Sequence, residues 1–548
     1  MEIRNIAIIA HVDHGKTTLV NKLLEQSETF KEYQHLEDRV MDSDQIERER
    51  GITILAKNTS IYFKNTRINI LDTPGHADFS GEVERIMHMV DGVLLLVDAY
   101  DGVMPQTRFV LKKALESGLT PIVIINKIDR PFANVQKTVN EVYDLFIDLG
   151  ADEKQLDFPI LYGSGLLGII NYDPELETNN KMDAILDTVL KNVPKPSQNI
   201  NLPFKFQPAL IDYNDYVGRM GIGKIYQGSV SVNETVSALR LDGSKITFKV
   251  QKIIQSQGLE KNEIKTAYAG DIVSIAGLSD IHVGETISSL QDDVRLEPLH
   301  VDKPTVQMTF STNNSPFAGK EGKNLTASKI EARLFKETQR DVSLKVERSN
   351  LIESWVVSGR GELHLGILIE NMRRENFEFQ VSRPTVINKE IDGVLMEPYE
   401  RVQIDLPNEY LGTIIEMIGD KKGELVKITQ AQTFSRIEYI VPSRGLIGIS
   451  TNFLTQTKGY GVLNSSFLEY RPHDGSKMIN RKQGALISTN EGVTTAYAIG
   501  RLEDRGIMFI SPRVPTYEGM IIGENNKETD LVVNVTQEKQ LTNMRSSS

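Results

Sequence analysis

Continuous apolar runs of strand length recur through the first part of the chain, with amphipathic helical segments between them. The runs at Ile6–Ile9, Ile68–Leu71, Gly92–Asp98 and Ile122–Ile125 contain few polar residues. A strand that is apolar on both faces is buried on both, which is typical of parallel sheets covered by helices. The pattern predicts an α/β domain over residues 1–197, with a mostly parallel sheet and helices on both sides.

The pattern changes after a proline-rich linker at Val193–Ser197. Over residues 201–291, short β-type runs are separated by Gly, Asn and Asp, which is typical of a small antiparallel barrel. The expected strands are Phe206–Asp212, Gly221–Ser229, Thr235–Leu239, Ile246–Ile254 and Ile272–Ala276.

Two later segments each follow the order β-α-β-β-α-β, the ferredoxin-like plait. The first occupies residues 303–386, and its expected elements are strand Thr305–Phe310, helix Leu325–Gln339, strands Val342–Glu347 and Ser354–Val357, helix His364–Arg374 and strand Phe377–Val381. The second occupies residues 393–472, with strands Glu400–Leu406, Glu424–Thr429, Ser435–Val441 and Val462–Tyr470 and helices Tyr410–Asp420 and Leu446–Thr457. Trp355, the only tryptophan, alternates with Val357 and is expected in the core of the first plait. Residues 473–548 are expected to be rich in β-structure.

The first strand leads directly into a candidate phosphate-binding loop. The stretch Ile6–Thr18, IAIIAHVDHGKTT, places Gly15, Lys16 and Thr17 between a strand and an apolar-periodic helix. In such a loop backbone N–H groups surround the phosphates, the lysine reaches the β- and γ-phosphates, and the threonine hydroxyl binds Mg²⁺. Ala10 stands where the general pattern has a glycine, which is acceptable if its φ is negative. The alternative is a chance Gly-Lys-Thr in a turn.

Three further motifs weaken that alternative, because they follow in the order that a guanine nucleotide-binding domain requires. RGIT at 50–53 lies in a charged loop, whereas DTPGH at 72–76 and NKID at 126–129 each follow an apolar strand. The Asp129 carboxylate can accept hydrogen bonds from the guanine N1–H and 2-amino group, a pair that adenine does not offer. The sequence therefore predicts a GTP site and not an ATP site. The charged segment Glu28–Arg50 is interpreted as irregular, with its ERER run in a solvated loop.

These motifs carry a resemblance to a known family. AHVDHGKTT, RGITI, DTPGHADF and NKID resemble the translational GTPases, the group that contains elongation factors Tu and G. VPSRGLIG at Val441–Gly448, together with RKQGALIS, LEDRGIMF, YEGMIIG, LVVNV and KQLTNMRSS nearer the C-terminus, resembles the BipA/TypA branch. The resemblance covers essentially the whole chain. The loop of this family often has alanine in place of its first glycine, as at Ala10.

The resemblance implies a multidomain α/β plus β fold. Its expected parts are a P-loop GTPase domain (1–197), a translation-factor β-barrel (201–291), ferredoxin-like plaits similar to domains III and V of elongation factor G (303–386 and 393–472), and a β-rich BipA/TypA-specific C-terminal domain (473–548). Chains of the family normally continue, with a basic stretch, past the position of Ser548. The last domain is therefore expected to be truncated, in a natural variant or a fragment.

The resemblance also implies which residues form the nucleotide site. Those expected to bind GTP or GDP are Asp13, His14, Gly15, Lys16, Thr17, Thr18, Gly75, Asn126, Lys127, Asp129, Ser164 and Gly165. Ser164 and Gly165 stand where the family has Ser-Ala and uses a backbone N–H toward guanine O6, which glycine can also supply. The expected Mg²⁺ ligands are Thr17, Thr53 and Asp72. Asp13 matches a position that can coordinate a monovalent cation such as K⁺.

The catalytic residues implied by the resemblance are His76, Lys16 and Thr53. His76 would orient the attacking water, Lys16 would neutralise phosphate charge, and Thr53 would join the metal only when the γ-phosphate is present. Val12 and Ile52 match the pair thought to keep this histidine turned away until the ribosome repositions it.

Other histidines invite a chemical interpretation. His11 and His14 flank Asp13, but a metal site there is rejected, since a phosphate loop uses these positions for backbone geometry. His364 in GRGELHL is expected to have a structural role at a helix start and not to act as a ligand or catalyst.

The function implied is that of a ribosome-associated GTPase acting in large-subunit assembly and in translation under cold or other stress. Its expected partners are the intersubunit factor site of the ribosome, rRNA and A-site tRNA, with ppGpp as a candidate competitor for the nucleotide. Lys477, Arg481, Lys482 and Arg545 are candidate RNA contacts. An assembly scaffold or chaperone, in which hydrolysis serves only release, is the alternative. Elongation factor G itself is disfavoured because its fourth domain is missing between the two plaits, and a metabolic kinase is disfavoured by NKID and RGITI.

Amino-acid composition narrows the range of candidate functions only slightly. The 548 residues carry a formal net charge of −12, which alone argues against nucleic-acid binding, although 62 Lys and Arg could gather on one face. The absence of cysteine excludes disulfides and thiolate sites. Without a long apolar run or a signal-peptide pattern, the chain is expected to be cytoplasmic, to make no membrane contact and to be a monomer off the ribosome.

Overall fold

Strand β4 (Gly92–Asp98) lies at the centre of the first sheet, whose order is β2-β3-β1-β4-β5-β6-β7. The computed structural model describes residues 2–11, 14–27, 45–50, 56–74, 80–176, 181–197, 199–258, 260–299, 301, 304–430, 434–476 and 483–539. The other strands of this sheet are β1 (Glu2–Ala10), β2 (Lys57–Phe63), β3 (Thr66–Asp72), β5 (Thr120–Asn126), β6 (Ile160–Ser164) and β7 (Ile169–Asn171). The pairs β3–β1, β1–β4, β4–β5 and β5–β6 are parallel, and the edge strands β2 and β7 are antiparallel to their neighbours.

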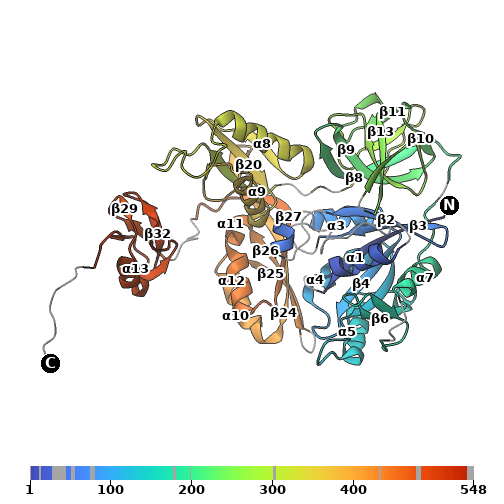
Figure 1. Cartoon of the computed structure of the whole chain (residues 1–548), viewed down its shortest axis with the longest axis horizontal. Helices are drawn as coiled ribbons and strands as arrows, with labels where there is room; N and C mark the ends of the chain where they lie inside the picture. The colour runs from blue at the N-terminus through green and yellow to red at the C-terminus, as the bar shows by residue number, and fades with distance from the viewer. Residues whose placement is uncertain are drawn as a thin grey trace. The chain divides into compact units, whose positions relative to one another are not determined.

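Helices cover both faces of this sheet because its strands are apolar on both sides (Figure 1). They are α1 (Lys16–Gln26), α3 (Ser80–Met87), α4 (Pro105–Glu116), α5 (Val135–Asp148), α6 (Glu153–Leu156) and α7 (Asp183–Asn192). A further short helix, α2 (Gln45–Arg50), packs instead against α9 (Glu362–Arg374) of the first plait. Ile6 and Ile8 pack with α1 and α7, whereas Ala7 and Ile9 pack with α3, α4 and α5. The alternation of a single strand thus supplies two separate cores.

An antiparallel barrel follows. Its strands are β8 (Lys205–Asn214), β9 (Gly218–Gln227), β10 (Ser229–Ser231), β11 (Thr235–Leu239), β12 (Lys245–Lys249), β13 (Lys252–Gln257), β14 (Glu260–Ile264), β15 (Thr266–Tyr268), β16 (Ile272–Ala276) and β17 (Thr286–Ser289). A buried ion pair between Arg67 and Asp271, and another of 2.8 Å between Lys224 and Asp91, join the barrel to the first sheet.

The first plait has the strand order β19-β20-β18-β21, with β22 also pairing with β18. Its elements are β18 (Val306–Ser311), α8 (Ala327–Arg340), β19 (Lys345–Arg348), β20 (Ser354–Gly359), α9 (Glu362–Arg374), β21 (Gln380–Val381) and β22 (Thr385–Val386). Trp355 is buried in the core of this plait, as predicted, with Phe310, Ile330 and Leu365.

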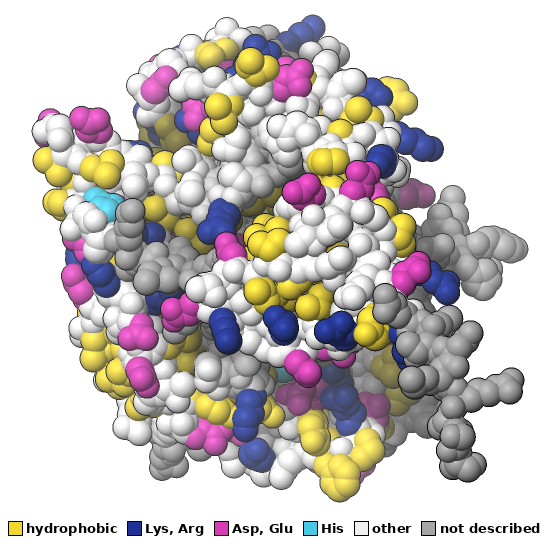
Figure 2. Space-filling view, turned by 90° about the vertical axis from the view of Figure 1, so that its left-hand side faces the viewer, with side chains coloured by type: hydrophobic (Ala, Val, Ile, Leu, Met, Phe, Trp, Pro, Cys, Tyr) yellow, Lys and Arg dark blue, Asp and Glu magenta, His cyan; other side chains and the backbone are white. Residues whose placement is uncertain are grey.

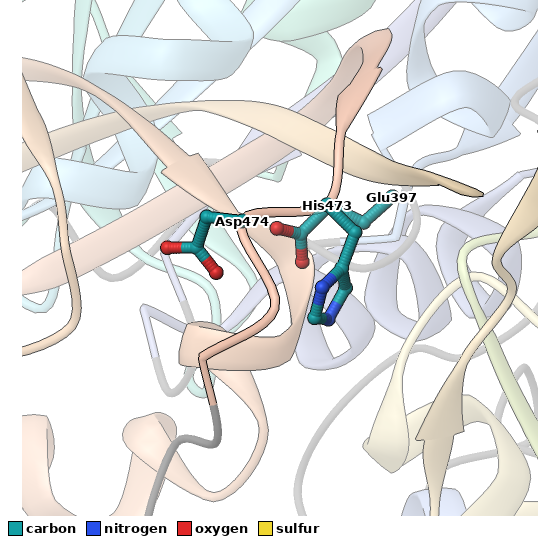
Figure 3. A group of neighbouring side chains, drawn as sticks. All are labelled: Glu397, His473 and Asp474. Atoms are coloured by element: carbon teal, nitrogen blue, oxygen red, sulfur yellow. The ribbon is translucent and has the colours of Figure 1, made fainter. Parts of the chain in front are cut away.

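The second plait repeats this arrangement in the order β23-β24-β26-β25, with β27 also pairing with β24. Its elements are β23 (Lys389–Ile391), β24 (Val394–Pro407), η2 (Asn408–Tyr410), α10 (Leu411–Gly419), β25 (Glu424–Gln430), β26 (Phe434–Pro442), α11 (Ser443–Leu446), α12 (Ile449–Gln456) and β27 (Val462–Pro472). Glu397 on β24 is completely buried, and its carboxylate lies 2.6 Å from Nε of Arg444 on α11 (Figure 3 shows Glu397).

Contacts divide the chain into two units: residues 1–312 with 322–472, and residues 313–321 with 473–548. The second unit contains β28 (Ala485–Ser488), β29 (Gly492–Val493), α13 (Ala496–Leu502), η3 (Glu503–Arg505), β30 (Gly506–Met508), β31 (Pro515–Thr516), β32 (Ile521–Asn525) and β33 (Leu531–Val533). The short piece 313–321 leaves the first plait between β18 and α8, and its Phe317 packs edge-on against Tyr517, with ring centroids 5.1 Å apart.

The second unit begins in a turn held by side chains. His473 Nδ1 accepts a hydrogen bond from the Gly475 N–H (2.8 Å), and Asp474 accepts one from the Ser476 N–H (3.0 Å). Figure 3 shows the side chains of His473 and Asp474. None of the helices among the described residues has the length and apolar character that crossing a membrane requires.

The predicted multidomain α/β plus β architecture is confirmed, but several expected elements were drawn too long. The strand expected over Phe377–Val381 is only β21 (Gln380–Val381). Ile246–Ile254 is two strands, because the Val250 and Gln251 N–H groups donate to Glu234 and Ala276 and break the run. Leu446–Thr457 is interrupted at Gly448, whose φ is 72°. The strand expected from Val342 begins only at Lys345, because Asp341 accepts hydrogen bonds from Ser343 in a turn.

Candidate functional site

The predicted phosphate loop lies at the carboxyl end of β1, where the chain turns into α1. Gly15 has φ 94°, and a Cβ there would lie 2.7 Å from Asn126 Nδ2, so the turn requires glycine. Lys16 begins α1, and Thr17 and Thr18 lie in its first turn. The loop therefore places backbone N–H groups of a helix start at one edge of the sheet, as phosphate binding requires.

Lys16 and Asp72 come together at this edge. Lys16 Nζ lies 2.8 Å from Asp72 Oδ1 and also donates a hydrogen bond to the Thr73 carbonyl. Both charged groups are buried, Asp72 completely. A buried carboxylate and a threonine hydroxyl both offer the hard oxygen ligands that Mg²⁺ prefers, so the chemistry of Asp72 and Thr17 suits that ion.

Asn126 connects the phosphate loop to the two loops predicted to hold the guanine base. Its Nδ2 donates to the His14 carbonyl (2.8 Å), and its Oδ1 accepts from the Gly165 N–H (2.7 Å). The N–H that was expected to face guanine O6 is thus directed at Asn126 in this structure. Ser164, beside it, is buried, and its Oγ accepts from the Leu167 N–H at 3.4 Å.

The other residues of the NKID motif differ in exposure. Asp129 is exposed, which suits the predicted contact of its carboxylate with a base. Lys127 has a left-handed φ of 60° and lies 2.7 Å from Asp98 Oδ2, which also lies 3.2 Å from Arg130. Burial alone would raise the pKa of Asp98, but hydrogen bonds from Lys127 and the Tyr100 N–H outweigh it and hold this pKa below its ordinary value.

Asp98 is a site residue that the sequence reasoning missed. It is completely buried at the end of β4, in register with Asn126 on β5. A signal was present, because Asp98 ends an apolar strand in the way that Asp72 does.

His14 contributes its backbone to the site and buries its ring. Nδ1 lies 3.4 Å from both the Leu96 carbonyl and the Asp98 N–H, and the ring packs edge-on against His11 with centroids 5.2 Å apart. Burial, followed by the neighbouring His11, lowers the pKa of His14 to about 3, so its ring is neutral at pH 7.

Several predicted site residues lie outside the described residues. They are the expected catalytic and metal-binding His76 and Thr53, the nucleotide contacts Asp13 and Gly75, the pair Val12 and Ile52, and the candidate RNA contacts Lys477, Arg481, Lys482 and Arg545.

The interpretation of the ERER run as a solvated loop is wrong, because Gln45–Arg50 forms α2. Glu47 is buried and lies 2.5 Å from Lys57 Nζ. Ile46 packs against Ile367 on α9 of the first plait. The segment that directly precedes RGIT is thus held by tertiary contacts that its charged sequence does not reveal.

The first plait also contacts the helix that follows the DTPGH motif. Arg360 lies 3.2 Å from Glu82 on α3, and both side chains are largely buried. Four residues on, His364 forms a buried ion pair with Asp341, and its Nδ1 lies 3.3 Å from the Arg360 backbone nitrogen. Burial works against the charged imidazole, but the Asp341 carboxylate outweighs it and raises the pKa of His364.

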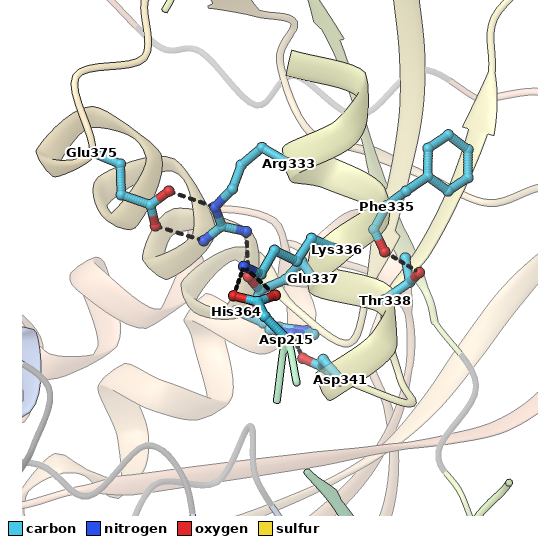
Figure 4. A network of polar contacts seen from close by, with 9 residues as sticks. All are labelled: Asp215, Arg333, Phe335, Lys336, Glu337, Thr338, Asp341, His364 and Glu375. Carbon is cyan, nitrogen blue, oxygen red and sulfur yellow. Dashed lines mark hydrogen bonds and ion pairs between the residues drawn. The ribbon is translucent and has the colours of Figure 1, made fainter. Parts of the chain in front are cut away.

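The same plait carries a polar network between its helices. Figure 4 shows Arg333 on α8 held by Glu337 and by both carboxylate oxygens of Glu375, and Lys336 paired with Asp215 at the tip of the β8–β9 hairpin. His364 sits in this framework with Asp341 as its partner (Figure 4).

Comparison with protein families gives matches to four parts of the chain. The family described as elongation factor Tu GTP binding domain matches residues 1–195, and elongation factor Tu domain 2 matches residues 218–288. The family described as elongation factor G C-terminus matches residues 394–481, and the TypA/BipA C-terminal domain matches residues 483–548.

Individual proteins are similar over the full chain. "Large ribosomal subunit assembly factor BipA" of Bacillus subtilis (strain 168) is 56% identical, covering 100% of this chain and 89% of that protein. The protein of the same name from Escherichia coli (strain K12) is 49% identical, covering 100% and 90%. A Thermus thermophilus protein, solved as "Crystal structure of ttk003000868", superposes with a TM-score of 0.60 at 16% identity over 86% of this chain and 98% of that one, which shows a shared fold.

Proposed function

The chain belongs to the BipA/TypA family, and from this premise we propose that it is a ribosome-binding GTPase acting in assembly of the large ribosomal subunit. The reaction would be hydrolysis of GTP to GDP and phosphate. The observation that carries the proposal is the junction made by Asn126, which ties the His14 carbonyl of the phosphate loop to the Gly165 N–H of the guanine-binding side. It is supported by the similarity to relatives named large ribosomal subunit assembly factor BipA.

Each described residue of the site suits a step of GTP binding. The N–H groups at the start of α1 would hold the phosphates. The Lys16 side chain would turn from Asp72 so that its ammonium group contacts the β- and γ-phosphates. Asp129 would accept from the guanine N1–H and 2-amino group, while Asn126 keeps the two halves of the site in register. Mg²⁺ bound by Thr17, Asp72 and Thr53 would supply positive charge beside the phosphates. We also propose that Asp13 coordinates a monovalent cation such as K⁺.

His76 would orient the attacking water, and the Gly75 N–H would contact the γ-phosphate. No described residue stands as an arginine finger beside Lys16. Intrinsic turnover is therefore expected to be slow and to rise strongly on ribosomes.

The proposed partners are the intersubunit factor site of the ribosome, rRNA and A-site tRNA, with ppGpp as a competitor for the nucleotide. The match of residues 483–548 to the TypA/BipA C-terminal domain supports this assignment. Figure 2 shows acidic and basic side chains interspersed on one face of the molecule, so the described residues there form no field of a single sign. RNA contacts on this face would therefore be local. The chain would work in the cytoplasm as a monomer off the ribosome, with a role in translation under cold or other stress.

The test is GTP turnover with and without purified ribosomes, for the unchanged chain, for His76→Ala and for His88→Ala as a matched control with an exposed histidine. We expect strong stimulation for the unchanged chain and for His88→Ala. His76→Ala should bind GTP but lose the stimulation. Turnover that ribosomes leave unchanged would contradict the proposal.

The alternative is an assembly scaffold in which hydrolysis serves only release. It predicts that His76→Ala still restores growth in the cold to a strain lacking its own BipA. Loss of this rescue would favour hydrolysis as the working step.

A further inference from the structure

Strand β4 ends between the two halves of the candidate nucleotide site. It pairs with β1, which leads into the phosphate loop, and with β5, which leads into NKID. Asp98, the last residue of β4, is completely buried and stands in register with Asn126. Topology therefore places one buried carboxylate between the phosphate side and the base side of the site.

Asp98 contacts both sides. Its backbone N–H lies 3.4 Å from Nδ1 of His14 in the phosphate loop. Its carboxylate lies 2.7 Å from Lys127 Nζ and 3.2 Å from Arg130, and it accepts the Tyr100 N–H at 2.8 Å. A buried carboxylate is costly unless it is paired and hydrogen-bonded, and all these partners meet that need.

Lys127 needs such an anchor. Its φ of 60° is a left-handed conformation that a residue with a Cβ adopts only when its surroundings hold it there. Its side chain also runs beside the phosphate loop, since a Cβ on Gly15 would lie 3.7 Å from Lys127 Cε. The ion pair with Asp98 fixes the far end of this side chain and so fixes its stem against the loop.

We propose that Asp98 is a positioning residue for the guanine nucleotide: by fixing Lys127 it sets the wall of the base pocket relative to the phosphate loop. The inference rests on the proposed function. It adds a residue that touches no part of the nucleotide and acts only through Lys127. Since Asp129 reads the guanine edge, removing the Asp98 charge should weaken GDP and IDP binding by the same factor.

The experiment is titration of the full chain with N-methylanthraniloyl-labelled GDP. The variants are Asp98→Asn, Lys127→Gln, which keeps most of the stem and removes the charge, and the double variant. Asp148→Asn is the matched control, because it removes an aspartate that pairs with Arg108 at 2.6 Å on the surface of the same domain. Thermal melts of each variant monitor folding.

We expect Asp98→Asn and Lys127→Gln each to weaken binding by about tenfold, and the double variant to match either single one, because coupled residues are not additive. Asp148→Asn should bind like the unchanged chain. Binding by Asp98→Asn within about twofold of the unchanged chain, or losses that multiply in the double variant, would overturn the inference.

If Asp98→Asn does not fold, Lys127→Gln decides, and unchanged affinity there overturns the inference equally. The two proposals fail in different ways. An unchanged chain that binds no labelled GDP removes the proposed function and this inference together. An unchanged chain that binds, alongside an Asp98→Asn variant that binds equally well, removes the inference alone.

Discussion

Arg360 of the first plait and Glu82 of α3 lie 3.2 Å apart, although 278 positions separate them in the chain. Both side chains are withdrawn from water, so the pair is screened little by salt. Helix α3 directly follows the DTPGH motif, so this contact attaches the first plait to the segment expected to respond to the γ-phosphate.

Replacing Arg360 by Met should destabilise the first plait by about 3 kcal/mol, because Glu82 is left buried without this partner. Trp355, the only tryptophan, lies in the core of that plait, so its fluorescence during urea unfolding reports on this domain. Arg373→Met, which removes an exposed pair with Glu370, should change stability by less than about 1 kcal/mol. Equal losses of stability in the two variants would show that burial does not determine how much each ion pair contributes to the free energy of unfolding.

The stability of the first plait should fall as the pH rises above the folded pKa of His364. Asp341 raises the pKa of His364 above its ordinary 6.5, and His364 in turn lowers the pKa of Asp341 below its ordinary 3.8, against the effect of burial. The His364 contribution is complete below about pH 6.5 and is lost as the imidazole deprotonates in the folded state, whereas the Asp341 contribution is complete above about pH 3.8. The pair therefore stabilises the fold most between these limits, with Arg360 opposing and Glu82 favouring the charge on His364.

His364→Gln should be destabilised by about 3 kcal/mol near pH 6, and the difference from the unchanged chain should shrink toward pH 9. Urea midpoints read by Trp355 fluorescence across this range test it. A difference that is the same at every pH would mean that the imidazole is not charged in the folded state.

Gly448→Ala should destabilise the second plait by about 1 kcal/mol, since φ is 72° there and alanine is strained in that region. Its N–H also donates to Glu362 of α9 at 2.7 Å, so a shift would disturb the contact between the two plaits. Gly412→Ala is the opposite case: it lies in α10 with nothing within 4 Å of the added Cβ. That change should stabilise by about 0.5 kcal/mol. Thermal melts of both variants should move in opposite directions.

Asp129→Asn should weaken GDP binding by about a hundredfold, because two hydrogen bonds to a charged acceptor are lost or reversed. The amide could instead pair with the 2-oxo group of xanthine, so XDP binding should improve in the same variant. Competition titrations with GDP and XDP measure both. A loss for both nucleotides would place Asp129 in a structural role.

The fold was predictable wherever local periodicity decides it. The apolar run of β4 and the two β-α-β-β-α-β orders follow from spacing that neighbouring residues share, and both plaits form with that order. The interruption at Gly448 was not predictable from periodicity, because a single positive φ ends a helix without changing the apolar pattern.

The candidate site was predictable where a motif fixes a loop next to a strand, as for Lys16 and Asn126. The features that sequence analysis did not predict depend on contacts with residues far away in the chain. Glu47 looks solvated in sequence and is buried because Lys57 and the first plait cover its helix. Asp98 ends an apolar strand as Asp72 does, but its place between the two halves of the candidate site becomes visible only when β4 is placed between β1 and β5.

The second unit is assembled from two pieces of chain, 313–321 and 473–548, with the rest of the first plait and the whole second plait between them. A chain that folds as it is synthesised would present Phe317 long before Tyr517 exists. If the first plait closes before residues 473–548 are made, the 313–321 piece has to leave it as an open loop. Removing the chain after Pro472 would likewise leave the aromatic ring of Phe317 without Tyr517 to pack against. Pro472 is therefore a poor position at which to truncate this protein.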